Sequence, residues 1–158
     1  MRASRASADH GAGRNAEWQV RTRPPVELAP QDALALLASA TFGRVVFTYR
    51  ALPTVCLVDH VVDDGLIVIR SRSTSRIAAA IADQLPYPTV VAYEADEVDA
   101  TSRLGWQVIA TGVVRAVTDP EQVARLKRLP RSWADPTMNS FLTLQPEIIT
   151  GLLLSLSV

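Results

Sequence analysis

The segment from Ile69 to Arg76 carries the densest set of side chains suited to binding an anion. It reads Ile69-Arg70-Ser71-Arg72-Ser73-Thr74-Ser75-Arg76, so three arginines are interspersed with four hydroxyl residues. A helical pattern follows at once, and a helix N-terminus stabilises a phosphate through unpaired N–H groups and its dipole. Arginine adds charge-assisted bonds. The segment therefore predicts a phosphate site, although hydroxyl residues that only cap the helix would give the same pattern.

Two further places carry polar side chains next to apolar ones. Asp59 and His60 interrupt an apolar stretch, and because successive strand residues face opposite sides, one of them must leave the interior. They form either a satisfied buried hydrogen bond or a ligand-facing position. Trp106 and Gln107 begin a later strand and would present an indole and an amide on opposite faces. Trp133, in a proline-flanked loop, would cover either a pocket or an interface.

The remaining sequence excludes most common enzyme machinery. It has no Gly-x-x-x-x-Gly-Lys-Ser/Thr loop, no Gly-x-Gly-x-x-Gly and no Gly-x-Ser-x-Gly. The single cysteine, Cys56, has apolar neighbours and is expected to be a buried, inert thiol. With His10 and His60 as the only histidines, a zinc site or a Ser-His-Asp triad has little support. We expect the chemistry to come from a bound cofactor instead.

Composition narrows the class of protein. The chain has 158 residues, of which 48% are hydrophobic and 20% charged, values typical of one globular domain. Lys+Arg and Asp+Glu are 16 each, so nucleic acid is not an expected partner. No apolar run approaches the ~18 residues that cross a bilayer, so neither a membrane nor a compartment other than the cytoplasm is expected.

Residue patterns divide the chain into a tail and one domain. Residues 1–24 are small, polar and basic without periodicity, and they predict a disordered tail before a domain over 25–158. A helix is expected to begin at Gln31-Asp32 and to end at Gly43. Three antiparallel strands in meander order should follow, over Arg44 to Tyr49, Thr54 to Val62 and Leu66 to Ser71.

The second half of the domain is also expected to consist of strands with inserted helices. A helix capped by Ser73, Thr74 or Ser75 should stop at Leu85-Pro86-Tyr87-Pro88. Asp96 to Arg103 is expected to be an acidic exposed connection between strands at Thr89 to Glu94 and Trp106 to Val117, with Gly112 at a bulge. Asp119-Pro120 begins a third helix, and Phe141 to Leu144 and Gly151 to Leu156 supply one or two last strands. Six to seven strands with about three inserted helices predict a mainly β, closed or nearly closed antiparallel barrel.

The order of these features resembles the pyridoxamine 5′-phosphate oxidase-like superfamily of flavin-binding split β-barrels, in particular its short bacterial members. The resemblance covers about residues 28–156. It rests on Leu34-Ala35-Leu36-Leu37, Gly43-Arg44-Val45-Val46-Phe47, Pro53-Thr54-Val55-Cys56-Leu57-Val58, Leu66-Ile67-Val68-Ile69-Arg70-Ser71, Ser75-Arg76, Val90-Val91-Ala92-Tyr93-Glu94-Ala95-Asp96-Glu97-Val98-Asp99 and Gly105-Trp106-Gln107-Val108 before Gly112.

The resemblance implies a homodimer that binds FMN, or in some branches a deazaflavin, between its subunits. It assigns the ribityl phosphate to Ser71, Ser75 and Arg76, with Arg70 in the same contact strand. The flavin ring would lie beside Val58, Asp59 and His60, and would contact Gln107 with Trp106 adjacent.

Departures from the family pattern concern the substrate and one contact to the cofactor phosphate. Val55 stands where the true oxidase has an active-site arginine, Ile77 stands at a second, lysine-type phosphate contact, and Gln145 to Leu152 lacks the arginine and histidine cluster that grips pyridoxamine. Oxidation of pyridoxamine phosphate is therefore not expected. The leading hypothesis is a flavin-dependent oxidoreductase with an unspecified small-molecule redox substrate, in which His60 moves a proton. The alternatives are a non-catalytic binder of flavin, or less favourably of haem, and a cofactor-free barrel.

Overall fold

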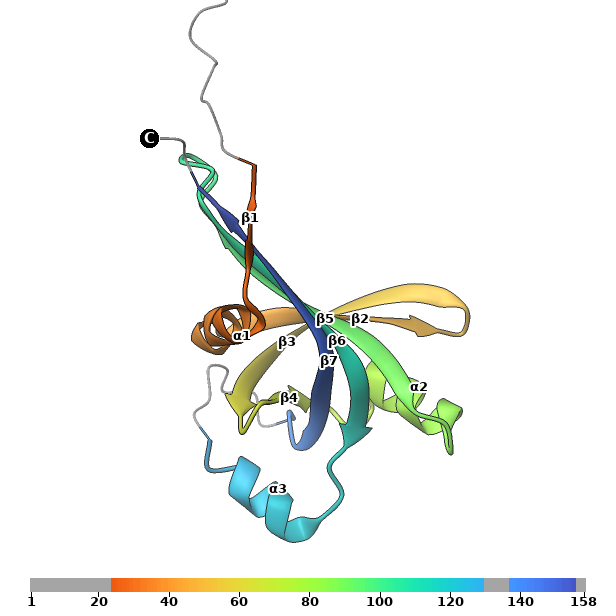
Figure 1. Ribbon diagram of the computed structural model, residues 1–158. Helices are drawn as coiled ribbons and strands as arrows, with labels where there is room; N and C mark the ends of the chain where they lie inside the picture. Colours follow the sequence, from red (N-terminus) through yellow and green to blue (C-terminus); the bar gives the residue numbers. More distant parts are fainter. Residues whose placement is uncertain (1–23, 130–136, 156–158) are drawn as a thin grey trace, which may run out of the picture.

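Seven strands and three helices make up the part of the chain that the structure describes, residues 24–129 and 137–155 of a computed structural model (Figure 1). The elements in chain order are β1 (Val26–Leu28), α1 (Pro30–Ser39), β2 (Phe42–Tyr49), β3 (Leu52–Asp63), β4 (Leu66–Ser71), α2 (Arg76–Gln84), β5 (Thr89–Val98), β6 (Gly105–Ala116), α3 (Pro120–Leu126) and β7 (Ser140–Leu154). The mainly β class with three inserted helices is confirmed. All but the last residue of the predicted 1–24 tail, and Trp133, lie outside the described residues.

Antiparallel pairing closes six of the strands into a ring. The sheet order is β1-β7-β4-β3-β2-β5-β6, and a further pairing of β7 with β6 completes the circuit. The long β7 lies along β6 on one edge, while its other edge is divided between β4 and β1. The predicted barrel is therefore confirmed, with β1 as an addition that the sequence did not indicate.

Residue alternation explains which faces of the strands are buried. In β2, Gly43, Val45 and Phe47 are buried while Arg44 and Val46 are exposed, as expected when one face of a sheet covers the core. In β4 every residue from Ile67 to Ser71 is buried, because the outer face of this strand is covered too. Val68 there packs with Leu126 of α3 in a second apolar cluster.

Helix α1 ends at Ser39, so the predicted stop at Gly43 is wrong. Gly43 instead lies inside β2, directly against the phenol ring of Tyr93, where any Cβ atom would collide with that ring. Glycine at position 43 therefore allows this close packing within the barrel. The helix ends earlier than predicted, with Ala40 as the residue that caps its C-terminus.

Strand β5 continues to Val98, so the acidic connection predicted from Asp96 is also partly wrong. The acidic residues fit a strand because they alternate with buried ones: Ala95 faces the core, while Asp96 reaches Arg44 on the outer face. The turn begins at Asp99, whose carboxylate accepts the backbone N–H groups of Thr101 and Ser102. These bonds lower the pKa of Asp99.

The predictions for the bulge at Gly112, the start of α3 and the last strand are confirmed. The register of β6 against β7 shifts between Thr111 and Gly112, at the predicted bulge. Asp119 caps α3 by accepting the backbone N–H of Glu121, and Pro120 opens the helix. The last segment is one strand rather than two. Among the described residues, none of the helices combines the length and the apolar composition needed to traverse a bilayer.

Candidate anion site and barrel opening

Ser71 and Ser75 meet at the junction between β4 and α2. Their Oγ atoms lie 2.6 Å apart, and the Ser75 Oγ also accepts the backbone N–H of Ala78 at 3.3 Å, which caps the helix. Of the three possible caps in the sequence, Ser75 is therefore the one used. The remaining N–H groups of a first helical turn have no partner within the helix. The junction thus combines two hydroxyl groups with the positive end of a helix.

Arg76 is the first residue of α2 and its side chain is exposed. The charge of Arg76 acts on Cys56, a half-buried free cysteine in β3. Burial raises the pKa of the Cys56 thiol, and the positive charge of Arg76 acts against that rise. The guanidinium of Arg76 therefore lies within electrostatic reach of the middle of β3. Cys56 was expected to be buried, but the structure buries it only in part.

Strand β3 has an open edge in this region. It pairs with β2 along Leu52–Asp59, but its pairing with β4 covers only His60–Asp63. Between Leu52 and Asp59, no described strand pairs with the second edge of β3. An unpaired strand edge presents a row of backbone N–H and C=O groups to whatever lies beside it. Figure 1 shows the β2–β3 hairpin extending away from the barrel on the side where α2 lies.

Val58 and His60 point into the barrel. Val58 belongs to the main core cluster, and His60 is only 6% exposed. Nε2 of the imidazole lies 2.8 Å from the carbonyl oxygen of Leu37 in α1, and Nδ1 lies 2.7 Å from the Tyr93 hydroxyl. Nε2–H therefore donates to the carbonyl and Nδ1 accepts from the hydroxyl. Burial lowers the pKa of His60, so the neutral ring is favoured.

Asp59 and Arg70 lie on the opposite, outer side of the same two strands. Both are buried, and Nη1 of Arg70 lies 3.4 Å from Oδ2 of Asp59. Nη2 of Arg70 donates to the carbonyl oxygen of Leu129, just after α3, at 2.9 Å. The structure therefore places the Arg70 guanidinium beneath α3, separately from Ser71, whose side chain faces the other way along the strand.

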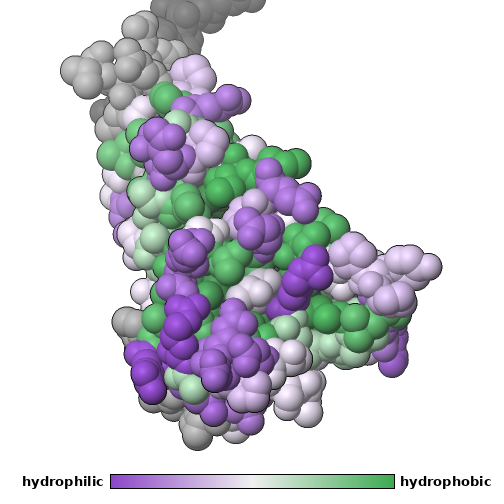
Figure 2. All heavy atoms as spheres, turned by 60° about the horizontal axis from the view of Figure 1, so that its bottom comes forward, coloured by the Kyte–Doolittle hydropathy of each residue, from purple (hydrophilic) through white to green (hydrophobic). Residues whose placement is uncertain are grey.

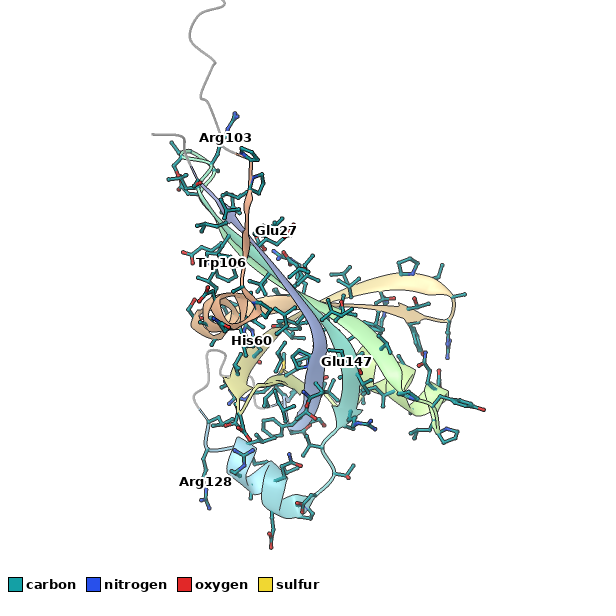
Figure 3. All side chains as sticks on the ribbon, in the orientation of Figure 1. Glu27, His60, Arg103, Trp106, Arg128 and Glu147 are labelled. Atoms are coloured by element: carbon teal, nitrogen blue, oxygen red, sulfur yellow. The ribbon has the colours of Figure 1, made fainter. Side chains whose placement is uncertain are left out.

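Trp106 and Gln107 also separate, as the alternation predicts. Trp106 is 7% exposed and belongs to the main core, close to α1 in Figure 3. Gln107 lies on the outer face, where its Nε2 donates to Oε1 of Glu94 at 3.2 Å. It lines a cleft of about 450 Å³ together with Arg44, Glu94 and Asp96.

Arg44, Glu94 and Asp96 form a charged cluster that the sequence did not predict. Nη1 of Arg44 bonds to Asp96 and to Glu94, and these bonds raise the pKa of the guanidinium. The partners lie some fifty positions away along the chain, and only the pairing of β2 with β5 brings them together. The segment Val90 to Asp99 was noted as a motif, but nothing in its local pattern indicated a partner on β2.

These positions define what the site can do chemically. The β4–α2 junction offers hydroxyl groups, a helix N-terminus and a cation, and it adjoins an open strand edge that offers backbone hydrogen bonds. Within residues 24–129 and 137–155 no group of three His, Cys, Asp or Glu side chains could hold a metal ion. The donor set fits a phosphate joined to a planar group with hydrogen-bonding atoms along one edge.

The ring of antiparallel strands with an opening beside β3 places the molecule in the class of split β-barrels. Within that class the chain belongs to the pyridoxamine 5′-phosphate oxidase family, whose sequence profile matches residues 29–152. The site residues Val58 to Gln107 all lie within this range.

Known proteins similar to this chain include one curated sequence and several solved structures. The chain is 45% identical over 130 residues to the uncharacterized protein Rv0080 of Mycobacterium tuberculosis, covering 82% of this chain and 86% of that protein. A candidate pyridoxamine 5′-phosphate oxidase from Corynebacterium glutamicum has a similar structure, with a TM-score of 0.71, 26% identity, and coverage of 86% of this chain and 97% of that one. The FAD binding protein from Mycobacterium smegmatis matches with a TM-score of 0.64, 25% identity, and coverage of 82% and 97%.

Proposed function

We propose that this protein binds a flavin, with FMN as the first candidate and a deazaflavin as the second. The observation that carries the proposal is the start of α2 next to the open edge of β3, where the charge of Arg76 acts on Cys56. Ser71, Ser75 and Arg76 would hold the phosphate, through hydroxyl bonds, the helix N-terminus and a charge-assisted bond. The open edge from Leu52 to Asp59 would pair with the polar edge of the flavin ring.

Two considerations support a flavin over other phosphates. The similar structure from Mycobacterium smegmatis is described as an FAD binding protein. FAD and FMN share the ring, the ribityl chain and the first phosphate, so one anion site beside one strand edge would suit both. A site built from the Ser71 and Ser75 hydroxyls and the N-terminus of α2 would hold this shared phosphate, with Arg76 as its cation.

A bound flavin supplies hydride transfer through its own ring, so the chain itself needs few reactive side chains. Its residues would bind the phosphate, orient the ring and exclude water. His60 was the candidate for moving a proton, but both ring nitrogens are already bonded, to Leu37 and Tyr93. A proton-carrying role would require one of these bonds to break, and binding haem through either nitrogen would require the same.

We further propose that two copies of the chain complete the site. Val46, Val55 and Leu57 are between 37% and 59% exposed, and the strand register places them on one outer face of β2 and β3. Ile109 and Ile148, also exposed, extend this face across β6 and β7. Contiguous exposed apolar side chains of this kind mark association surfaces. The same strands flank the proposed ring site, so a second copy would cover it.

The test is to titrate the purified full chain with FMN and to follow flavin fluorescence and absorption. Arg76→Ala should weaken binding by about tenfold or more, because it removes the cation of the clamp. Arg72→Ala is the matched control: it removes another exposed arginine of the same segment, to which the proposal gives no role. The proposal fails if the protein binds no flavin, or if the two variants bind alike.

The rival function is a flavin binder without turnover; the bonds of His60 to Leu37 and Tyr93 favour it over an oxidoreductase that relies on His60 to move a proton. It is separated from an oxidoreductase by adding NADH, NADPH or reduced deazaflavin to the flavin-loaded protein under anaerobic conditions. Bleaching of the bound flavin spectrum supports the oxidoreductase. An unchanged spectrum with every donor supports storage or sensing.

A further inference from the structure

A second cleft opens at the other end of α2, away from Ser75. It has a volume of about 520 Å³ and lies between the Leu85–Pro88 connection and the ends of β5 and β6. Leu85 and Tyr87 on its rim are 69% and 75% exposed. Figure 2, in which the bottom of Figure 1 comes forward, shows apolar side chains at the surface between polar ones. The cleft thus has apolar walls open to solvent.

Thr89, at the start of β5, lines this cleft and is 3% exposed. Its hydroxyl is buried, and within the described part of the chain it has no hydrogen-bond partner. A buried hydroxyl without a partner is destabilising, and such groups are uncommon in folded proteins. Neighbouring inward-facing residues, such as Val91 and Val114, are apolar, so packing alone does not call for a hydroxyl here.

Arg115 supplies a cation on the wall of the same cleft. The ion pairs found among the described residues involve Arg44, Arg70 and Arg125, and none involves Arg115. The cleft therefore combines a cation that no described carboxylate neutralises with an apolar rim and a buried hydroxyl. The rim residues and Thr89 belong to one stretch of the chain, whereas Arg115 comes from β6.

We propose that this cleft binds a small aromatic carboxylate with a polar substituent on its ring, independently of the flavin site. The carboxylate accepts bonds from Arg115, because guanidinium and carboxylate form strong charge-assisted pairs. The ring packs against Leu85 and Tyr87. The ring substituent reaches the Thr89 hydroxyl, which gains the partner that it lacks.

The experiment titrates the ¹⁵N-labelled full chain, with any cofactor it carries, using 4-hydroxyphenylacetate as the probe. Saturable shifts should centre on the amides of Tyr87, Thr89 and Arg115, with a dissociation constant on the order of 1 mM or tighter. Two matched probes dissect the recognition: phenylacetate lacks the ring hydroxyl, and 2-(4-hydroxyphenyl)ethanol lacks the charge. Shifts confined to Ser71–Arg76, or no saturation, would overturn the proposal.

Variants test the proposed contacts of Arg115 and Thr89 separately. Arg115→Gln should weaken 4-hydroxyphenylacetate about tenfold and leave the uncharged alcohol unchanged, whereas Arg103→Gln, at the far end of the molecule in Figure 3, should change neither. Thr89→Val should weaken 4-hydroxyphenylacetate but not phenylacetate. The Tm of Thr89→Val should equal or exceed that of the wild type, because an unpartnered hydroxyl is removed. A lower Tm, or equal losses for both acids, would contradict the role given to Thr89.

Discussion

His60 and Tyr93 form a buried polar contact inside the barrel, and their hydrogen bonds connect three elements. The imidazole joins α1, through Leu37, to β5, through Tyr93, while its own backbone lies in β3. Such a buried pair is stabilising only while every polar atom has its partner. The pair therefore sets the orientation of α1 on the strands, and it is sensitive to changes of single atoms.

Tyr93→Phe should lower the free energy of unfolding by about 1–2 kcal/mol, because it leaves Nδ1 of His60 buried without a donor. Urea denaturation followed by tryptophan fluorescence measures this loss. Tyr49→Phe is the control, since Tyr49 lies at the end of β2 and makes no such bond to His60. Equal effects of the two variants would show that the hydrogen bond contributes nothing.

The pH dependence of stability follows from His60 as well. Burial lowers its pKa from the ordinary 6.5, so below that pH the unfolded chain binds a proton that the folded chain does not. The free energy of unfolding should therefore fall as the pH drops below about 6.5. His60→Gln should flatten the profile between about pH 6.5 and 5, above the range in which carboxylates titrate. Thermal unfolding across this range is the measurement, and a profile unchanged by the substitution would refute it.

Single residues also show how far the sequence could predict the site. The sequence correctly placed Ser71, Ser75 and Arg76 at one junction, because these residues are close together in the chain and a helix start can be recognised from local sequence. Whether they bind a cofactor remains a prediction. The partners of His60 and Arg44 could not be predicted, because they depend on strand register between segments that lie far apart in the chain.

At the scale of elements, the start of α2 has two separable roles. Ser75 caps the helix through its Oγ, and the proposed phosphate would use the same atom. Aspartate caps helices as well as serine does but carries a negative charge. The two roles can therefore be tested with one substitution.

Ser75→Asp should keep the Tm within a few degrees of the wild type and abolish measurable FMN binding, because the carboxylate repels the phosphate. Ser75→Ala should lower stability by about 1 kcal/mol and weaken FMN only moderately. Differential scanning fluorimetry and fluorescence titration report the two quantities. If Ser75→Asp binds FMN normally, Ser75 only caps the helix.

Arg70 links the barrel to the end of α3, because its Nη2 donates to the Leu129 carbonyl oxygen while its Nη1 lies beside the buried Asp59 carboxylate. Arg70→Met should destabilise the protein by about 3 kcal/mol, since it leaves the Asp59 carboxylate buried without this cation. The double variant Arg70→Met with Asp59→Leu should lose less than the single one. Chemical denaturation of the variants checks this order, and the reverse order would show that the pair contributes little.

The boundaries of elements were predicted less well than their existence. β4 and the bulge at Gly112 appeared where the pattern placed them. Gly43 and Asp96 misled because residues typical of turns lie inside strands, where a ring contact and an ion pair from neighbouring strands hold them. Tertiary contacts of this kind override local propensity.

At the scale of the whole molecule, the exposed apolar face of β2 and β3 predicts self-association. Val55→Lys should convert a dimer into monomers without unfolding them, because the side chain is 59% exposed in the single chain. Light scattering coupled to size exclusion measures the mass. Leu85→Lys, which changes an exposed residue at the end of α2, is the control. A wild-type protein that is already monomeric would contradict the proposed dimer.

Strand β7 has a consequence for how the protein is made. It is the shared partner of β1, β4 and β6, and β1 has no other strand partner among the described residues. None of these pairings can form until residues 140–154 have left the ribosome. During synthesis the strand edges of β4 and β6 stay available to other chains, which favours aggregation. Closure of this barrel should therefore wait until β7 has been synthesised, and protection of the nascent chain by chaperones should matter until then.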